Sequence, residues 1–531
     1  MSLSSGTPST LLTGHTPTRW YHFRPRTIVL ILLPVLSFLG AYGTWGLARS
    51  NGILAAITAL FAEELPKFPG TEDPLLLRYT GFKAIDYRLS NLVIFSAPVL
   101  DLSHADLTLF GFHGFGQFGA AWTLIMMESM RMGNRFRAVS YIGTVGVLFQ
   151  QLTLISISTV GALFLKLSFA VVVPLWLFLH ILVSPVAKPF PGTHANRVLL
   201  VPSWDLRILP FSIVLGYIVP SLLMALPSPK FVDQSLHQVY IAFWHAFPIW
   251  TVGIHAITIR ASQWIVKKMW DETNRKPPKP QGTSYLNNVK HVYRFVLALC
   301  IITHIPVVVI ALLPPWVIPE STPTLALLGK NNILDIFVPY FPRPSYRVHF
   351  LAEGVHTFLM WDLYVGAAAF LTWAVLLYRN ATSEKAIVDP NKSLPIYGEL
   401  FLGNRPQDAP LWRKLFPKIA LWTLVSGPIG ALAILLWERD AISVNVKYQD
   451  HQATQFGSQH VLMFRDQVQV PVQVPPSKEP TNGNRIGEFD DGAATSQDLS
   501  STSYITTKKK TSLRALTDRA HELLRPFSSQ L

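Results

Sequence analysis

Residues 106–131 combine an apolar composition with four side chains that can carry protons or form hydrogen bonds. These are Asp106, His113, Gln117 and Glu128. On an α-helix, at about 100° per residue, the four side chains fall within about 60° of one another and therefore share one stripe. Ionisable groups at membrane depth are costly and usually face a partner or a cavity. The stripe therefore predicts either a functional cavity or a set of buried polar contacts.

Glu128 has the strongest case for acid–base chemistry among the four. Neighbouring methionines make its expected surroundings largely apolar, and a carboxyl group in such a site tends to keep a proton that it can donate. The structural alternative is an ion pair with Arg131, three residues further on. In the same alternative, Asp106 caps the helix, while His113 and Gln117 hydrogen-bond neighbouring helices.

A second apolar segment, residues 353–378, carries Asp362. Gly366, Ala369 and Trp373 fall within about 40° of Asp362 on a helix. An acid, a gap left by two small residues and an indole ring would then share one face. The alternative for Asp362 is a hydrogen bond between two helices.

The composition of the chain is that of a membrane protein. Its 531 residues are 50% hydrophobic and only 14% charged, with a mean hydropathy of +0.32, whereas soluble domains carry about 25% charge. The net charge of +14 does not indicate nucleic-acid binding, because the basic residues lie mostly between apolar runs, as the positive-inside rule expects. The single cysteine, Cys300, excludes an intrachain disulfide and a Cys-rich metal site. No HExxH or P-loop motif is present, and we expect no metal or cofactor.

These properties predict an all-α, polytopic integral membrane bundle of about eight or nine transmembrane helices. We expect spans at about 27–48, 106–128, 139–162, 167–184, 208–226, 239–258, 293–313, 353–377 and 417–437. Residues 51–62 are short enough to lie in the membrane interface, and residues 63–103 include a broken apolar piece that is typical of a re-entrant segment. The predicted domains are a disordered cytosolic N-terminus (1–26), the transmembrane domain (27–437) and a mostly disordered tail (438–531).

Five pieces of the chain, in order, resemble a family of polytopic fungal proteins encoded with secondary-metabolite pathways. The family includes membrane-bound terpene cyclases of meroterpenoid biosynthesis, of the kind that close ascofuranone-type products. The pieces are residues 79–101, 116–134, 212–227, 239–250 and 358–378. The resemblance covers about residues 75–380, and ESMRMGN at 128–134 is its most specific part. The chain departs from the family pattern at His245, where the family has Gln, and at Trp361, where it has Tyr. Both departures bear on which substrate is bound.

The resemblance implies a cyclase that starts its reaction by protonating an apolar prenylated substrate, and the acids of the chain permit this chemistry. Glu128 and Asp362 are the expected acid–base pair, and Asp101 and Asp86 are further candidates. Aromatic rings would stabilise the carbocations. The side chains expected to do so or to contact the substrate are Trp122, Trp244, Trp361, Trp373 and His245. No metal or organic cofactor is implied.

The predicted protein lies in the lipid bilayer, which we expect to be the endoplasmic reticulum membrane, and other pathway enzymes are expected partners. Two other functions are open at this point. A transporter or exporter of the pathway product would line a permeation route with the polar stripe. A non-catalytic scaffold would hold partner enzymes by its basic loops. One closed apolar pocket containing Glu128 and Asp362 would favour the cyclase.

Overall fold

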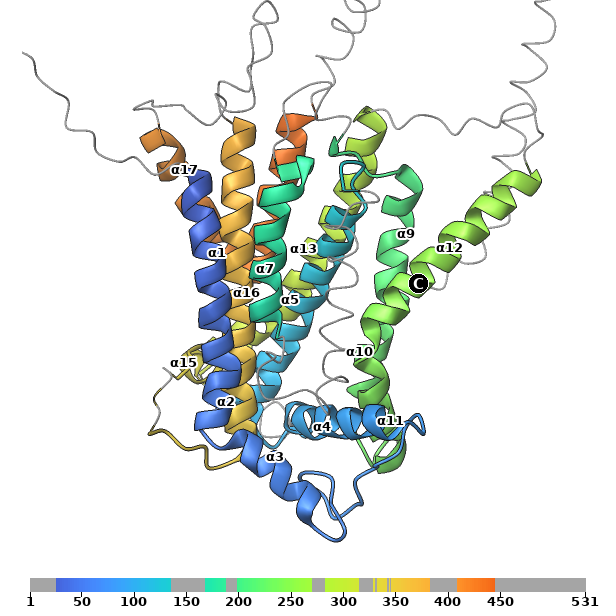
Figure 1. The fold of residues 1–531 in the computed structure, drawn as a ribbon, viewed down its shortest axis with the longest axis vertical. Helices are drawn as coiled ribbons and strands as arrows, with labels where there is room; N and C mark the ends of the chain where they lie inside the picture. Colours follow the sequence, from blue (N-terminus) through green and yellow to red (C-terminus); the bar gives the residue numbers. More distant parts are fainter. Residues whose placement is uncertain are drawn as a thin grey trace, which may run out of the picture. The chain divides into compact units, whose positions relative to one another are not determined.

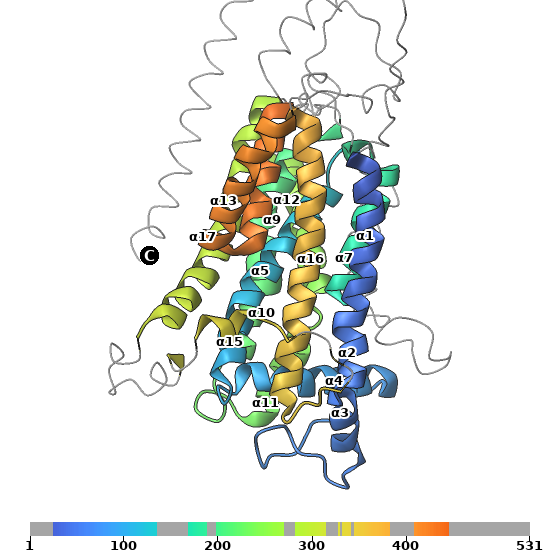
Figure 2. The same ribbon diagram turned by 90° about the vertical axis from the view of Figure 1, so that its left-hand side faces the viewer.

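A computed structural model of the chain is shown in Figures 1 and 2. It describes residues 25–134, 168–187, 198–269, 282–314, 328–329, 332–340, 343, 345–382 and 408–444, and each structural statement below concerns these residues. The chain divides into two units, Met1–Val461 and Leu462–Leu531, and all described residues belong to the first. The named elements of the described residues are all helices.

Five helical stretches in these ranges are long and apolar enough to cross a membrane. They are Pro25–Ser50, Ser203–Met224, Tyr285–Leu312, Leu351–Thr382 and Leu415–Ser443. Two further pairs of helices, bent by 111° and 65°, raise the number to seven if each pair is one span. The prediction of an all-helical membrane protein is confirmed at this level.

Two of the five stretches contain π-helical turns. Pro25–Ser50 comprises α1 (Pro25–Ala41), a π-turn (Tyr42–Gly46) and α2 (Leu47–Ser50), and Ser203–Met224 comprises α9 (Ser203–Ile213), a π-turn (Val214–Ile218) and α10 (Val219–Met224). The longer helices of the bundle are α5 (Ala105–Ser129), α12 (Phe247–Met269), α13 (Gly282–Leu312), α16 (Leu351–Thr382) and α17 (Asp408–Ser443). The shorter ones are α3 (Ile53–Ala62), α4 (Lys83–Leu100), α7 (Phe169–Val183), α11 (Gln234–Trp244) and α15 (Ile333–Phe337).

Most predicted spans coincide with helices. Helices occupy the predicted positions at about 27–48, 106–128, 208–226, 293–313, 353–377 and 417–437. The predicted span 239–258 is broken, because α11 and α12 meet at 65° around His245. The predicted span 167–184 appears as α7, which has only 15 residues. The predicted span 139–162 lies outside the described residues, as do residues 1–24 and everything after residue 444.

The corner between α4 and α5 is the feature that positions the site. The two helices meet at 111°, and Figure 1 shows α4 lying across the bundle while α5 runs along it. Leu102, in the connection between them, has a positive φ of 60°. Because α4 also packs against α3, α11 and α16, it closes one end of the space between these helices. The corner falls in the segment that the sequence predicts to be re-entrant.

The Gln117 side chain supports a break in α17. Gly427 has a φ of +74°, a conformation that favours glycine, and a proline follows it. The Gln117 amide donates to the Ser426 carbonyl (3.0 Å) and accepts from the Ile429 N–H (3.0 Å). Two backbone groups at the break are thereby satisfied. The expected hydrogen bond from Gln117 to a neighbouring helix is confirmed.

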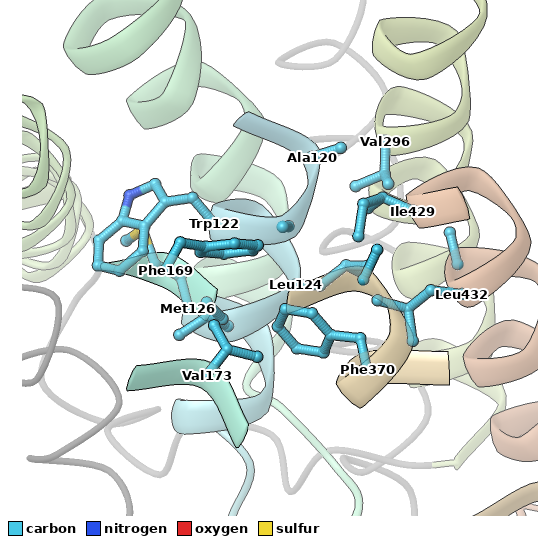
Figure 3. Packing of buried hydrophobic residues seen from close by; sticks show 14 of the residues in the cluster. Ala120, Trp122, Leu124, Met126, Phe169, Val173, Val296, Phe370, Ile429 and Leu432 are labelled. Atoms are coloured by element: carbon cyan, nitrogen blue, oxygen red, sulfur yellow. The ribbon is translucent and has the colours of Figure 1, made fainter. Parts of the chain in front are cut away.

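An apolar layer fills the bundle around the second half of α5 (Figure 3). Its members come from α5, α7, α13, α16 and α17 and include Trp122, Leu124, Met126, Phe169, Val173, Val296, Phe370, Ile429 and Leu432. Each of these side chains is buried. Phe118 and Glu128 lie on either side of this layer, ten residues or about 15 Å apart along α5. The apolar layer therefore lies between the surroundings of Phe118 and the surroundings of Glu128.

Candidate functional site

A cavity of about 340 Å³ lies between α3, α4, α5, the start of α7, the junction of α11 with α12, and α16. Cavities of this size and apolar character are typical of small-molecule sites. The aromatic rings in its wall include Phe95, Phe115, Phe118, Trp244, Phe247 and Phe358. Asp362 is the one carboxyl-bearing residue among the described residues that line it.

Asp362 faces this cavity from α16 and also contacts the first turn of α7. The Ala170 N–H donates to Asp362 Oδ1 at 2.8 Å. The first N–H groups of a helix have no hydrogen-bond acceptor within that helix. Asp362, on α16, supplies an acceptor for one such N–H group of α7. The predicted helix–helix hydrogen bond is therefore present, and the same carboxyl group is positioned on the cavity wall.

Gly366 allows α7 to approach Asp362 so closely. A Cβ atom at Gly366 would lie 2.4 Å from the Phe169 ring, which is closer than packed atoms approach. The small residue that the sequence places on the Asp362 face thus admits a ring of α7. We infer that Gly366 holds the start of α7 in position to orient the acid.

The aromatic rings of the wall contact one another in two groups. Phe358 of α16 meets Trp45 and Phe95 edge to face, with ring centroids 5.1 and 5.2 Å apart. Trp244 and Phe118 each contact Phe247, at 5.5 Å in both cases. Ring faces attract cations, and mutual packing fixes the orientation of each ring. The wall is therefore suited to surround a positively charged, apolar intermediate.

His245, another predicted site residue, lies beside Trp244 on the cavity wall. Its Nε2 is 3.1 Å from the Ser96 hydroxyl of α4, and only 8% of the residue is exposed. It occupies the break between α11 and α12, where the backbone turns. Three of the predicted site residues, Asp362, Trp244 and His245, therefore lie on the wall of one cavity.

Glu128 lies elsewhere, in a buried group of four charged side chains that we call the ion-pair cluster. The expectation of apolar surroundings is wrong, because Glu128 Oε1 lies 2.7 Å from Arg131 and 2.8 Å from Arg439. Asp440 completes the ion-pair cluster, at 3.0 Å from Arg131 and 2.9 Å from Arg439. Glu128 is not among the residues that line the cavity. The expected pocket shared by Glu128 and Asp362 is therefore not observed in the described residues, and the alternative pairing with Arg131 is.

Two tyrosines of α13 complete the coordination of Asp440. The hydroxyl groups of Tyr285 and Tyr293 donate to Asp440 Oδ2 at 2.7 and 2.8 Å. The ion-pair cluster thus joins α5, α13 and α17, and its two acids balance its two arginines. Charges buried in this way are tolerated because each one is paired and hydrogen-bonded. The geometry of the ion-pair cluster is that of a structural contact between helices.

The two further acid candidates also lie away from the cavity lining. Asp86 lies in the first turn of α4 and accepts hydrogen bonds from the backbone N–H groups of Tyr79, Thr80 and Gly81. Asp101 is exposed and accepts from the backbone and hydroxyl of Ser103. Both carboxylates therefore stabilise local turns at the ends of α4.

Within the described ranges, no three His, Cys, Asp or Glu side chains are grouped as metal ligands would be.

The remaining predicted tryptophans occupy three separate places. Trp122 is buried behind the cavity wall, where it packs on Phe247 and donates to Thr251. Trp361 lies beside Asp362 in sequence but donates to the Tyr340 carbonyl. Trp373 donates to His180 Nδ1, eleven residues or about 16 Å along α16 from Asp362. None of the three is among the residues that line the cavity.

The other members of the polar stripe on α5 have partners on neighbouring helices. Asp106 lies 3.2 Å from His356 of α16, and the Nδ1 atoms of His113 and His304 are 3.1 Å apart. His304 Nε2 also contacts the Leu424 carbonyl, at 3.0 Å. Together with Gln117, these side chains connect α5 to α13, α16 and α17. The stripe is therefore a set of buried polar contacts rather than the wall of a route.

A second cavity, of about 260 Å³, adjoins the first. Val99 and Phe115 line both cavities. Its other lining residues are mainly apolar and come from α4, α5, the π-turn before α10, α10 and α13, with Tyr217 and Ser221 among them. The α9–α10 span thus lines a cavity at and after its π-turn, where irregular helical backbone is tolerated in a membrane.

Sequence reasoning missed two groups of residues. Arg439 and Asp440 lie just beyond residue 437, where the predicted span ended, although α17 continues to Ser443. The run Trp-Glu-Arg-Asp at 437–440, directly after an apolar stretch, was the available signal. Phe95, Phe110 and Phe118 were missed because a phenylalanine in an apolar helix resembles every other core residue.

Comparison with known proteins supplies the family. The CtvD domain model matches residues 28–444. Terpene cyclase ctvD of Aspergillus terreus (strain NIH 2624 / FGSC A1156) is 28% identical over 405 residues, covering 76% of this chain and 96% of the relative. Terpene cyclase ascI of Acremonium egyptiacum is 24% identical, over 79% of this chain and 93% of the relative. Terpene cyclase atmA of Aspergillus flavus is also 24% identical, over 78% and 96%. No solved structure matches the chain.

The match to the CtvD domain extends from the first turn of α1 to the residue that follows α17, and so includes both cavities and the ion-pair cluster. The resemblance to terpene cyclases of fungal secondary-metabolite pathways is confirmed by these relatives. The chain belongs to the CtvD-domain family.

Proposed function

We propose that this chain is a membrane-bound terpene cyclase in which Asp362 protonates a prenylated substrate inside the aromatic cavity. The observation that carries the proposal is the position of one acid on a largely apolar cavity wall that includes many aromatic rings. The names of the relatives support the reaction class. The site assignment of Asp362 rests on the geometry.

The reaction begins with the transfer of the Asp362 proton to an epoxide oxygen or to a carbon of a terminal double bond. The C–O bond opens, or the double bond gives up its electron pair, and a carbocation forms. Neighbouring double bonds then attack in turn, forming carbon–carbon bonds, and loss of a proton from carbon leaves an isomer of the substrate. The Asp362 carboxylate and the His245 imidazole are the groups of the wall that can accept this last proton.

The cavity contributes to this chemistry in two ways. Ring faces of the wall stabilise positive charge as it moves along the chain. An apolar enclosure also keeps water from trapping the cation before ring closure is complete. A membrane location suits a substrate that is itself a long apolar chain.

Transport and scaffolding are less well supported. The polar stripe that suggested a permeation route is used in contacts between helices. The relatives described above are named as cyclases rather than as transporters or scaffolds.

We further propose eight or nine transmembrane spans in the endoplasmic reticulum membrane. Seven spans are possible in the described residues if each bent pair counts as one. The apolar run 139–162 and the segment of α7 are the additional candidates. A disordered tail and association with other pathway enzymes, but not with nucleic acid, remain part of the proposal.

Filling the cavity at Gly114 tests where the substrate binds. A Cβ atom at Gly114 would meet only Phe110 Cε1, at 4.0 Å, so a larger side chain can enter the cavity without displacing backbone. Microsomes that contain the protein are supplied with linear prenyl epoxides and assayed for an isomer of unchanged mass. We expect Gly114→Phe to lower product formation by at least about tenfold, or about 1.4 kcal/mol of transition-state stabilisation, whereas Gly114→Ala keeps most of it.

Gly253 provides the matched control. It is also a helical glycine, and a Cβ atom added to it would have nothing within 4 Å, but it lies on α12 outside the cavity lining. Gly253→Phe is expected to leave product formation unchanged. Equal product from wild type and Gly114→Phe would show that the substrate binds elsewhere.

A further inference from the structure

We propose that Arg88 binds an anionic oxygen group on the substrate, so that the substrate is an isoprenoid chain with an acidic head, such as a carboxylate. The inference rests on the proposed function, because it assumes that the aromatic cavity holds the substrate. Binding at Arg88 would define the chemical class of the substrate end that does not react, and the orientation of the substrate in the cavity.

Arg88 is the one Lys or Arg among the described residues that line the cavity. It lies on α4 and is partly buried. Within the described residues, no side chain forms an ion pair or a hydrogen bond with its guanidinium group, whereas each arginine of the ion-pair cluster is paired with two acids. A cation on a largely apolar wall is costly unless a ligand pairs with it.

The surroundings of Arg88 form a polar end to the cavity. Tyr87 and Asn91, its neighbours on α4, also line the cavity, and Thr58 of α3 is a further lining residue. The rings of Phe61 and Tyr87 are in contact at 5.2 Å, so α3 and α4 meet at this end. Hydroxyl and amide groups beside a guanidinium are suited to an oxygen-rich head.

Asp362 lines the same cavity from α16. Phe95, seven residues or about 10 Å along α4 from Arg88, contacts Phe358 of α16 at 5.2 Å. Phe358 is in turn one helical turn from Asp362. Leu92 is an apolar lining residue between Arg88 and Phe95 on α4. A chain with its head at Arg88 would therefore extend along this wall and present its far end to the acid.

Guanidinium chemistry selects the class of head group. Its planar N–H groups match the two oxygens of a carboxylate and can bind both at once. A phospholipid phosphate has similar chemistry, and α3 is a segment that the sequence predicts to lie at the membrane interface. We assign the anion to the substrate because Arg88 lines the same cavity as Asp362.

The test measures how tightly the protein binds two unreactive probes in a detergent free of phospholipid. The probes are fully hydrogenated farnesoic acid, which has no double bond to protonate, and its methyl ester. Wild type is expected to bind the acid more tightly than the ester. Arg88→Met should weaken binding of the acid by about 10- to 100-fold, the range for a hydrogen bond to a charged group, and leave the ester unchanged. Arg88→Lys should keep a preference for the acid. Lys83→Met, which removes an exposed cation at the start of α4, is the matched control and should change neither affinity.

Unchanged binding of the ester shows that Arg88→Met is folded, so loss of acid binding alone supports the proposal. Equal binding of acid and ester by wild type overturns it. Binding of phosphatidic acid vesicles that requires Arg88, together with acid binding that Arg88→Met leaves unchanged, also overturns it, because the anion would then belong to a lipid. The probes do not react, so a fully active Asp362→Asn enzyme would contradict the proposed function without deciding the role of Arg88.

Discussion

Asp362→Asn is expected to abolish cyclised product while the protein remains folded. The asparagine amide oxygen can still accept the Ala170 N–H, so the contact with the start of α7 is kept. The amide has no acidic proton to give, however, and loss of a general acid typically costs about 10²- to 10⁴-fold in rate. Product from the linear epoxide, measured per amount of folded protein, is the quantity to compare.

Asp101→Asn is the matched control for this substitution. Asp101 is an exposed carboxylate outside the cavity lining, and we expect its variant to form product at the wild-type rate. If Asp362→Asn also stayed within a few-fold of wild type, Asp362 would not be the proton donor. A large loss in Asp101→Asn alone would restore Asp101 as the candidate acid.

The second large effect is expected on stability, at Glu128→Gln. The substitution leaves Arg439 without its pairing to Glu128 and removes half the negative charge that faces the two arginines. Removing one partner of a buried ion pair typically costs about 3–5 kcal/mol. We therefore expect a much lower midpoint of thermal unfolding in detergent. The activity per folded molecule should stay close to that of wild type, because Glu128 lies beyond the apolar layer from the cavity.

Glu438→Gln is the matched control, because it removes the same charge from an ion pair that is not fully buried. Glu438 forms an ion pair with Lys418 on α17, but about a third of each side chain is exposed. Such surface pairs contribute about 0–1 kcal/mol, so its unfolding midpoint should change little. A Glu128→Gln protein that is as stable as wild type yet inactive would show that Glu128 takes part in catalysis.

The comparison of Asp362 with Trp373 shows what helical spacing can predict. The sequence correctly indicated that Asp362, Gly366 and Trp373 share one face of a helix, and Gly366 does create the close approach beside the acid. Spacing by three and four residues specifies a direction around the helix but says little about which neighbour is met at each depth. Trp373 is several turns from Asp362, and there it contacts His180 rather than the cavity.

The two interpretations of Glu128 differ for a similar reason. Its pairing with Arg131 is local, and the spacing of three residues was enough to propose it. The pairing with Arg439 joins positions 311 residues apart. No pattern within one helix contains that information, so the local sequence made Glu128 look like an unpaired acid. The membrane helices themselves were predictable because about 20 apolar residues in succession suffice to indicate a span.

The most direct test of the central claim is chemical rescue of an enzyme that lacks the acid. Asp362→Ala removes the carboxyl group and leaves space for a small molecule beside the cavity wall. With the purified variant, we expect almost no cyclised product, partial recovery when acetic acid is added, and no recovery with acetamide, which has the same shape but no acidic proton. Wild-type amounts of product from Asp362→Ala without any additive would contradict the central claim.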